Sequence, residues 1–291
     1  MSLVELVETP SLNSELADLE HFMMAEVSGT EGATSHSSAA VQAALRHLAS
    51  GGHRVRARLG FEAAERLGLA RNDAIVIGAT AELLHNASLI HDDLQDGGMI
   101  RRGQPTVLAA FGADVAVLSG DLLLSSAYSA IAQFSRPAMV GEMIRLIHRR
   151  TAQVIRGQCG DLSVRTHPVT EITRYEEIAA CKSGALLSLP LELALLGAGF
   201  RDALGLAHEA AESFGIGYQI VDDLNDAASD GQFTLNFLNV LTARHSEAEA
   251  NRIARETGAR RLNFAISAAN RLPARSGELL GKLARALSER L

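Results

Sequence analysis

Two short acidic segments carry most of the chemistry that this 291-residue chain offers. The first holds Asp92, Asp93 and Asp96, and the second repeats the spacing with Asp222, Asp223 and Asp226. On a helix, residues four apart share a face, so the first and last aspartates of each segment point together. Clustered carboxylates repel one another, and Mg²⁺ is the cation that typically bridges one or two carboxylates to substrate phosphates. Two such helices facing each other would hold a magnesium-bound diphosphate between them.

A single DDxxD segment suits a solvated helix end equally well. Here there are two copies, and each follows an apolar run that enters the predicted core. Four carboxylates meeting inside a protein need a cation to coexist. The pair of segments therefore favours metal binding over two solvated helix ends.

Basic residues lie near the first segment and in one later helix. Arg101 and Arg102 precede the Gly103–Pro105 turn, and arginine grips diphosphate oxygens with two parallel hydrogen bonds, although an Arg-Arg pair alone is usually surface. Gly51-Gly52-His53-Arg54-Val55-Arg56 is compatible with a phosphate cradle at a helix start. Lys182, one of two lysines, lies in an apolar helix and suggests an anionic partner, whereas His85 alone suits a satisfied core histidine.

The elements that must position these residues are predicted to be helices. Hydrophobic residues make up 47% of the chain and aromatic residues 4%, with no Trp, which favours helices over sheets. No segment alternates with period two, and the apolar pattern is helical between Gly- and Pro-containing breaks such as 97–98 and 103–105. The predicted helices are 37–50, 72–94, 112–134, 138–159, 173–197, 203–226 and 247–270, with a kink expected at Pro190.

We predict an all-α protein, a single large helical bundle around a central cavity. It would form one domain over residues 1–291, with residues 1–36 less certain. The formal net charge of −7, with both signs interspersed, argues against nucleic acid as the principal partner. Cys159 and Cys181 suggest neither a disulfide framework nor a zinc site. The first residues lack a signal-peptide pattern, and no apolar stretch was expected to reach the roughly 20 residues that span a bilayer. These features predict a cytoplasmic protein without stable membrane insertion.

Several ordered motifs now point to one family. His85 to Asp96 followed by Arg101-Arg102-Gly103-Gln104-Pro105-Thr106 matches, in order and spacing, the first aspartate-rich motif of the trans-polyprenyl diphosphate synthases. Gly157-Gln158-Cys159-Gly160-Asp161-Leu162 is similar to their GQxxDL, and Lys182-Ser183 to their Lys-Thr pair. Gly217-Tyr218-Gln219-Ile220-Val221-Asp222-Asp223 is similar to their GxFQIxDD. From about Ser37 to the C-terminus, the chain resembles the farnesyl, geranylgeranyl and longer-chain prenyl synthases.

The resemblance implies a role for each matching residue and an isoprenoid-synthase fold. Mg²⁺ would be bound by Asp92, Asp96 and Asp222, with Asp226 in support. The allylic diphosphate would be held by Arg101 and Lys182, and isopentenyl diphosphate by Arg56, His85 and Arg102, with His53 where the family has lysine. Ser183 and Gln219 would lie near the developing carbocation. The family also implies a homodimer.

The implied reaction is consistent with the residues. Metal and cationic side chains stabilise a departing diphosphate, so that the allylic carbon–oxygen bond ionises. The double bond of isopentenyl diphosphate then attacks, and a proton is lost to the released diphosphate. Water must be excluded, which an apolar bundle achieves.

Two departures from the family pattern bear on activity. His53 makes one isopentenyl-binding cation weaker and pH-dependent. After Asp226 the family has a longer loop with two lysines, whereas this chain has Ser229 to Leu235, with Gln232 where a lysine is expected. We expect a less tightly closed site, an altered substrate or lost activity.

Product length is expected to depend on the bulk before the first motif. Ala87 and Ser88 are small and would leave a tunnel open there, with Tyr128 as a deeper floor. The prediction is a product of C20 or longer, which Ala87→Phe would shorten.

Two rival functions are kept. The chain is a non-catalytic subunit of a hetero-oligomeric synthase if the missing lysines abolish condensation. A class I terpene cyclase is the other, because residues 225–229 begin like the second metal motif of that class. However, Phe233 stands where that motif has Glu, and the aromatic residues that would stabilise migrating cations are scarce.

Overall fold

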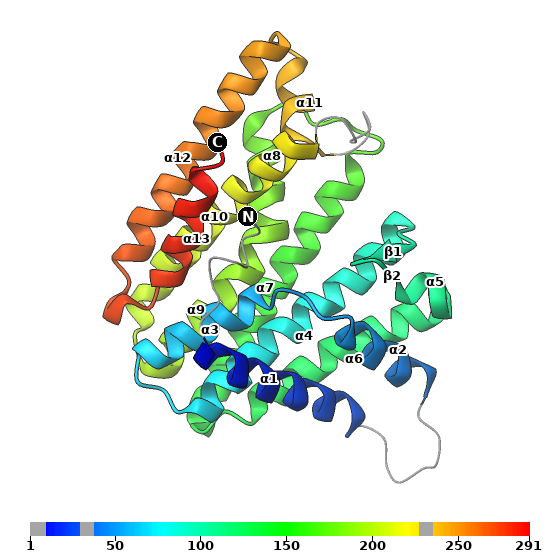
Figure 1. Cartoon of the computed structure of the whole chain (residues 1–291), viewed down its shortest axis with the longest axis vertical. Helices are drawn as coiled ribbons and strands as arrows, with labels where there is room; N and C mark the ends of the chain where they lie inside the picture. The colour runs from blue at the N-terminus through cyan, green and yellow to red at the C-terminus, as the bar shows by residue number, and fades with distance from the viewer. Residues whose placement is uncertain (1–9, 30–37, 227–234) are drawn as a thin grey trace. The chain divides into compact units, whose positions relative to one another are not determined.

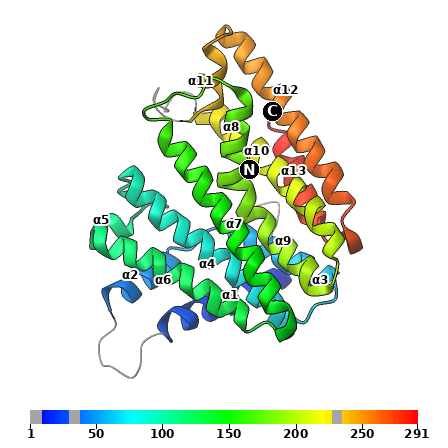
Figure 2. The same cartoon turned by 180° about the vertical axis from the view of Figure 1, so that it is seen from behind.

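The computed structural model describes residues 10–29, 38–226 and 235–291. It divides into two compact units, Glu8–Arg145 and Leu146–Leu291, which we call the N-terminal and C-terminal units. Figures 1 and 2 show that nearly every described segment is helical, as predicted. The prediction of a single domain around a central cavity stays a prediction, because the structure is described as two separate units.

In the N-terminal unit, the long helix α4 (Arg71–Asp96) is the central element. It packs against α1 (Pro10–Ser28), α3 (Val55–Arg66) and α6 (Ala113–Ala132), while α2 (Ala39–Ala49) packs against α6 and α1. The short helix α5 (Val107–Phe111) follows a two-stranded hairpin. Apolar side chains of α4, such as Ile77, Leu83 and Ile90, are fully buried or nearly so, which fixes the rotation of the helix and therefore the direction of its acidic end.

The hairpin is the one element that the period-two analysis did not predict. β1 (Ile100–Arg101) and β2 (Gln104–Pro105) pair antiparallel, with Ile100 opposite Pro105 and Arg101 opposite Gln104. Strands of two residues are too short to show alternation in the sequence. The all-α fold class is confirmed, and the hairpin is a local addition whose turn at residues 102–103 overlaps the break predicted at 103–105.

The helix α7 (Pro137–Ser163) runs from the end of the N-terminal unit into the C-terminal unit. The C-terminal unit then contains α8 (Ile172–Ala179), a π-helical turn (Ala180–Gly184), α9 (Ala185–Ala198), a 3₁₀ turn (Arg201–Ala203) and α10 (Leu204–Asp226). After the gap come α11 (Phe237–Thr242), α12 (Glu247–Asn270), a second 3₁₀ turn (Pro273–Arg275) and α13 (Glu278–Ser288). The helix α10 packs against α9 and α12, and its buried face includes Ile216 and Ile220.

Six of the seven predicted helices are confirmed within a few residues, and 247–270 matches α12. The seventh, 173–197, is confirmed as one continuous helical segment, Ile172–Ala198, in which a π-helical turn that was not predicted separates α8 from α9. This irregularity lies before Pro190, and α9 continues through that proline. A π turn depends on i→i+5 hydrogen bonding, which no residue type announces in the sequence.

Two segments, Ala113–Ala132 and Ile172–Ala198, are long and apolar enough to cross a membrane by length and composition alone. The expectation that no stretch would reach this length was therefore wrong. In the second segment 78% of the most apolar window is buried inside the protein, and in the first 44% is buried. Buried core helices pass the same test, so the two segments are weak evidence for membrane insertion.

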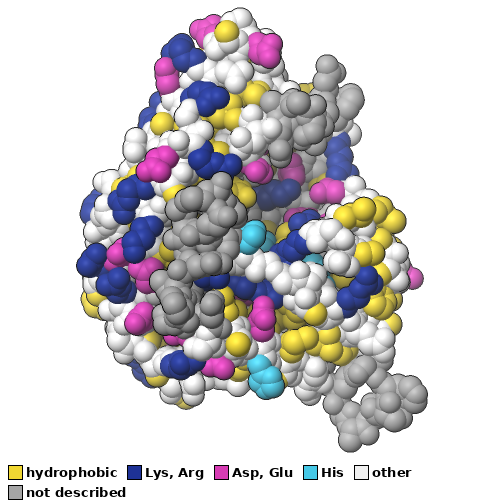
Figure 3. Space-filling model, in the orientation of Figure 1, with side chains coloured by type: hydrophobic (Ala, Val, Ile, Leu, Met, Phe, Trp, Pro, Cys, Tyr) yellow, Lys and Arg dark blue, Asp and Glu magenta, His cyan; other side chains and the backbone are white. Residues whose placement is uncertain are grey.

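On the face drawn in Figure 3, basic and acidic side chains are interspersed and no broad basic surface is present.

Candidate active site

The acidic end of α4 presents two of its aspartates outward and turns the third inward. Asp92 is partly exposed and Asp96 is exposed, whereas Asp93 is only 5% exposed. The helix ends directly afterwards at Gly97, whose φ of 67° favours glycine, and the Gly98 amide donates to the Asp93 carbonyl oxygen at 2.8 Å. Asp92 and Asp96 thus lie on the last turn of a helix, where the predicted metal ligands were placed.

Asp93 is held by Arg101, which reaches it from β1. The Arg101 Nε lies 3.0 Å and 2.9 Å from the two carboxylate oxygens, and one terminal nitrogen lies 2.8 Å from Oδ1. The Arg101 side chain remains 34% exposed. A predicted diphosphate ligand is therefore oriented by a buried carboxylate that the sequence analysis assigned no role.

Arg102 folds back over the turn before α3. One of its terminal nitrogens donates to the Gly51 carbonyl oxygen. Its guanidinium lies so close to Gly52 that a Cβ there would come within 2.7 Å of the Arg102 Cζ. The approach of Arg102 thus favours glycine at position 52, and it connects two segments that are 50 residues apart in sequence.

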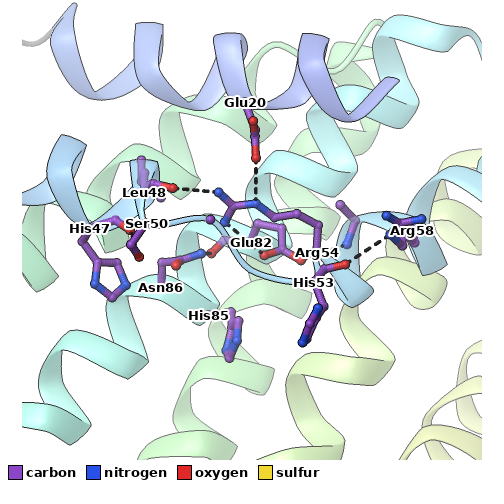
Figure 4. Close-up of polar contacts among 12 residues, drawn as sticks. Glu20, His47, Leu48, Ser50, His53, Arg54, Arg58, Glu82, His85 and Asn86 are labelled. Atoms are coloured by element: carbon purple, nitrogen blue, oxygen red, sulfur yellow. Dashed lines mark hydrogen bonds and ion pairs between the residues drawn. The ribbon is translucent and has the colours of Figure 1, made fainter. Parts of the chain in front are cut away.

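Arg54, a buried side chain, holds the turn at Gly51-Gly52 in place through several polar contacts (Figure 4). It is 5% exposed; one terminal nitrogen donates to the Leu48 carbonyl oxygen at 2.9 Å, and its Nε reaches Glu20 at 3.4 Å. The buried Glu82 lies 3.8 Å from the other terminal nitrogen and accepts a hydrogen bond from the Ala57 amide at 3.1 Å. Glu82 thus occupies the Ala57 amide in the first turn of α3, and the phosphate cradle at residues 51–56 stays a prediction.

The remaining predicted isopentenyl-diphosphate ligands gather around this turn. The rings of His53 and His85 point to the same side of it, away from Glu20 (Figure 4). Burial, and then the positive charges of Arg56, Arg102 and Arg101, lower the pKa of His85 well below its usual value. His85 is therefore neutral, and the cations that perturb it are those predicted to bind an anion with it.

The acidic end of α10 repeats this division of roles. Asp222 is exposed, whereas Asp223 is 3% exposed. The Asp223 carboxylate accepts hydrogen bonds from the Tyr175 hydroxyl at 2.6 Å, the Phe237 amide at 2.7 Å and the Gln219 side-chain amide at 2.9 Å. Asp226 is the last residue of α10, and its side chain lies outside the described residues. Gln232, which stands where the family pattern has one of its two lysines, also lies outside the described residues.

The contact with Asp223 gives Gln219 a second role. It was predicted to lie near the carbocation, and its amide nitrogen is bonded to the buried carboxylate one helical turn later. The same carboxylate fixes the start of α11, because it accepts a hydrogen bond from the Phe237 amide. Asn236 caps this helix, since its side-chain oxygen accepts a hydrogen bond from the Leu238 amide at 2.8 Å.

Lys182 pairs with Asp161, so the prediction that this lysine has an anionic partner is borne out by the contact. The Lys182 ammonium donates to Asp161 Oδ2, and both side chains are partly buried. Ser183 follows in the same π-helical turn and is partly buried. The turn lies so close to α7 that a Cβ on Gly157 would come within 2.6 Å of the Lys182 amide nitrogen. The glycine and the aspartate of the Gly157–Leu162 motif therefore position Lys182.

The carboxylates suit a magnesium ion that keeps water and phosphate ligands better than they suit an ion enclosed entirely by protein side chains. In the part of the chain that the structure describes, no three His, Cys, Asp or Glu side chains cluster as a metal site. Magnesium commonly takes one or two carboxylates and completes its shell with water and substrate phosphates. Asp92 and Asp96 at the end of α4, and Asp222 at the end of α10, offer such partial sets.

The sequence analysis missed residues that orient the predicted ligands, namely Asp93, Asp223, Tyr175, Arg54, Glu82 and Asp161. Asp93 and Asp223 stood beside named ligands, and the helical periodicity would have placed them on another face. Asp161 and Arg54 were inside quoted segments. Tyr175 and Glu82 carried no sequence signal, because their partners are distant in the chain.

The described chain is almost entirely helical, two of its helices each end in an outward and an inward aspartate, and it has the fold of the isoprenoid synthases. The comparisons place it further. The polyprenyl synthetase family model matches residues 38–235, and the chain belongs to this family.

Among curated relatives, the chain is 31% identical over 189 residues to a short chain isoprenyl diphosphate synthase of Methanothermobacter thermautotrophicus, covering 64% of this chain and 58% of the relative. It is 36% identical over 174 residues to a (2E,6E)-farnesyl diphosphate synthase of Mycobacterium tuberculosis, covering 60% and 48%. The chain therefore spans about half the length of these relatives. A decaprenyl diphosphate synthase from Rhodobacter capsulatus has the same fold, with a TM-score of 0.81, 21% identity and 99% of both chains covered.

Proposed function

We propose that this protein is a magnesium-dependent trans-prenyltransferase that condenses isopentenyl diphosphate with an allylic diphosphate. The observation that carries the proposal is the division of each aspartate pair. Asp93 and Asp223 are buried and bonded, whereas Asp92 and Asp222 lie toward solvent. A pair whose inner member holds the helix end and whose outer member is accessible suits ligand binding better than a solvated helix end.

Each diphosphate has its own group of proposed ligands. Arg56 and Arg102 would bind isopentenyl diphosphate, and neutral His85 would donate one N–H to it, with His53 as a further, pH-dependent contact. Lys182, oriented by Asp161, and Arg101, oriented by Asp93, would bind the allylic diphosphate. Bidentate arginine contacts suit such anions.

Asp92, Asp96, Asp222 and Asp226 would hold magnesium, which when bound supplies positive charge to the departing diphosphate. The protein's own contribution to the next step is positional. Ser183 and the carbonyl oxygen of Gln219 would face the allylic cation, since the Gln219 amide nitrogen is bonded to Asp223. The released diphosphate accepts the proton lost after the new carbon–carbon bond forms.

The proposed product is C20 or longer. Ala87, 1% exposed on α4, is small, and Tyr128 on α6 is partly buried and would form a deeper floor. Replacing Ala87 with Phe should shorten the product by at least one isoprene unit; an unchanged product length would discredit this assignment. The homodimer and the cytoplasmic location stay predictions.

The test is product analysis with the purified full chain. Isopentenyl diphosphate is supplied with dimethylallyl, geranyl or farnesyl diphosphate, with magnesium or with a chelator, and the dephosphorylated alcohols are separated by chromatography. We expect linear prenyl products that require magnesium. Binding of both substrates without condensation would instead make the chain a non-catalytic subunit, and a cyclic hydrocarbon would make it a cyclase; neither rival is favoured by the family match.

A further inference from the structure

A cluster of polar side chains lies in the C-terminal unit where α7 contacts α9 and α10, and the proposed reaction gives it no role. Its strongest contact is an ion pair between Arg150 on α7 and Glu192 on α9, whose side chain is 1% exposed. The Arg150 Nε and one terminal nitrogen lie 2.7 Å and 2.5 Å from the two Glu192 oxygens. The other terminal nitrogen donates to the Gln153 side-chain oxygen at 3.0 Å. An arginine that is itself fixed therefore holds one end of the Gln153 side chain.

The orientation of the Gln153 amide follows from its partners. Its oxygen faces Arg150, and its nitrogen lies 2.8 Å from Oε1 of Glu212 on α10. Burial alone would raise the Glu212 pKa, but contacts with His208, Gln153 and Arg150 outweigh burial and lower it. Arginine only donates hydrogen bonds and an ionised carboxylate only accepts them. Only one orientation of the amide therefore satisfies both partners.

The same amide reaches the π-helical turn that carries Lys182 and Ser183. Gln153 forms a hydrogen bond with the side chain of Cys181, the residue directly before Lys182. A side-chain NH₂ group has two protons, so it can donate to Glu212 and to Cys181 at once. One side chain thus connects α7, α10 and the π-helical turn.

Gln153 is the first of three residues on α7 that face this turn. Gln153, Gly157 and Asp161 are four residues apart, so they share one side of the helix. Gln153 bonds to Cys181, and Gly157 lies against the Lys182 amide nitrogen. Asp161 accepts a hydrogen bond from the Lys182 ammonium. This row therefore holds the residue before Lys182, then the Lys182 backbone and then its side chain.

The other side of the turn is closed by the backbone of α10. A Cβ on Gly215 would come within 2.7 Å of the Gly184 amide nitrogen. A Cβ on Gly184 would in turn come within 2.7 Å of the Glu212 Cα. Close packing therefore fixes the turn on the α10 side, whereas polar contacts from α7 fix it on the side of Cys181 and Lys182.

We propose that Gln153 is a positioning residue, which holds the π-helical turn so that the Lys182 ammonium meets Asp161. Without the Gln153 amide, the turn loses its attachment at Cys181, and the pair between Lys182 and Asp161 is formed less of the time. The consequence for substrate rests on the proposed function, in which Lys182 binds the allylic diphosphate.

Lysine side-chain NMR tests the positioning role without substrate, because the chain contains only two lysines, Lys182 and Lys282. The full chain is labelled with ¹³C at the lysine Cε, and Lys282→Arg identifies the remaining signal as that of Lys182. Asp161→Asn gives the position of this signal when the ion pair is lost. Gln153→Met keeps the length of the side chain but removes its amide. We expect it to move the Lys182 signal toward the Asp161→Asn position, while the Lys282 signal stays in place.

Gln133→Met is the matched control. The Gln133 amide also donates to a carboxylate, that of Glu26, but both residues lie in the N-terminal unit. This variant should leave the Lys182 signal unchanged. If Gln153→Met does not fold, Gln153→Asn replaces it, because an amide one carbon shorter does not reach both Arg150 and Glu212. A Lys182 signal that is the same in the wild type and in the folded variant at position 153 overturns the proposal.

Steady-state kinetics extends the test to the proposed reaction. Gln153→Met should raise the KM for the allylic diphosphate by about threefold to tenfold, the range for loss of one neutral hydrogen bond. The KM for isopentenyl diphosphate should stay unchanged, and Gln133→Met should change neither value. An equal rise of both KM values overturns the proposal, since it indicates a general structural effect. If the wild-type chain condenses no substrate, the proposed function fails, and the Lys182 signal alone decides whether Gln153 positions this lysine.

Discussion

The end of α4 and the end of α10 solve the same problem with different chemistry. At each end an aspartate pair has an outward first member and a buried second member. Asp93 meets the charged Arg101 with three contacts of 2.8–3.0 Å. Asp223 meets three neutral donors, from Tyr175, Gln219 and Phe237.

The difference shows that the repeated acidic spacing does not specify how the buried carboxylate is held. An ion pair with a partly exposed arginine leaves some of the charge available to a ligand. Three neutral donors instead hold a negative charge in place and fix the backbone of another helix, α11. We infer that the first arrangement orients an arginine that is proposed to bind substrate, whereas the second serves local structure.

The largest expected effect is on the outward aspartates. Asp92→Ala and Asp222→Ala should each reduce condensation by roughly 10²–10³-fold, comparable to the removal of other electrostatic catalytic groups. Because Asp222 is exposed and Asp92 partly exposed, the free energy of unfolding should change by less than about 1 kcal/mol. Steady-state kinetics and denaturant unfolding measure the two quantities. If either variant lost its activity because it unfolded, the distinction between the outward and the inward aspartates would no longer hold.

The inward aspartates should show the opposite pattern. Asp223→Asn should reduce the free energy of unfolding by about 3 kcal/mol, because the new NH₂ group faces a donor in a fully buried network. Asp93→Asn should reduce it by about 2 kcal/mol, less than for a fully buried pair, because Arg101 is 34% exposed. Chemical denaturation of both variants gives the comparison. A larger loss for Asp93→Asn would reverse our view of which pair is structural.

Acid should affect the α4 site first. His47 lies in the field of Arg102, Asp93 and Arg101, and burial, followed by Arg102, lowers its pKa to about 4. With an unfolded value of 6.5, the native state binds fewer protons, so stability is present above pH 6.5 and is lost as the pH falls toward 4. At pH 5 the loss should be about 2 kcal/mol, and it should disappear in His47→Phe. Denaturation of both proteins across this range measures it; identical pH profiles would exclude His47 as the cause.

Alkali should affect the α10 site by a smaller amount. Burial, followed by the Asp223 charge and hydrogen bond, raises the Tyr175 pKa well above 10. The native state therefore retains the proton, so this contribution is present below pH 10 and is lost at higher pH. The loss at pH 11 should be about 1 kcal/mol relative to Tyr175→Phe. Ultraviolet titration of tyrosinate provides a direct check, since the signal that is lost in Tyr175→Phe should titrate well above pH 10. Titration of this signal near pH 10 would contradict the burial argument.

The sequence was sufficient for the long helices that were predicted, because their apolar periodicity is long and their ends carry strong signals. Gly97-Gly98 ends α4 directly after Asp96, and the pattern of 247–270 coincides with α12. The hairpin and the π-helical turn were missed because two strands of two residues and a change to i→i+5 bonding leave no periodic trace.

For the candidate site, the residue types predicted the ligands but not their supports. Arg101 was named from its spacing to Asp92, yet its bond to Asp93 depends on the path of β1. Tyr175 and Phe237 reach Asp223 from 48 and 14 residues away. Only the folded chain brings such donors together, and a single sequence does not show which residues that are distant along the chain become neighbours in space.

The π-helical turn at Ala180–Gly184 amounts to one extra amino acid absorbed inside an otherwise continuous rod. Because the extra residue is accommodated within this one turn, the apolar residues of Ala185–Ala198 remain buried. The backbone widens only where Lys182 and Ser183 lie. Shortening this bulge by one position would yield a smoother rod, but it would swing the ammonium group away from Asp161. The π-helical turn therefore allows a mostly apolar helix to direct the Lys182 ammonium group toward Asp161.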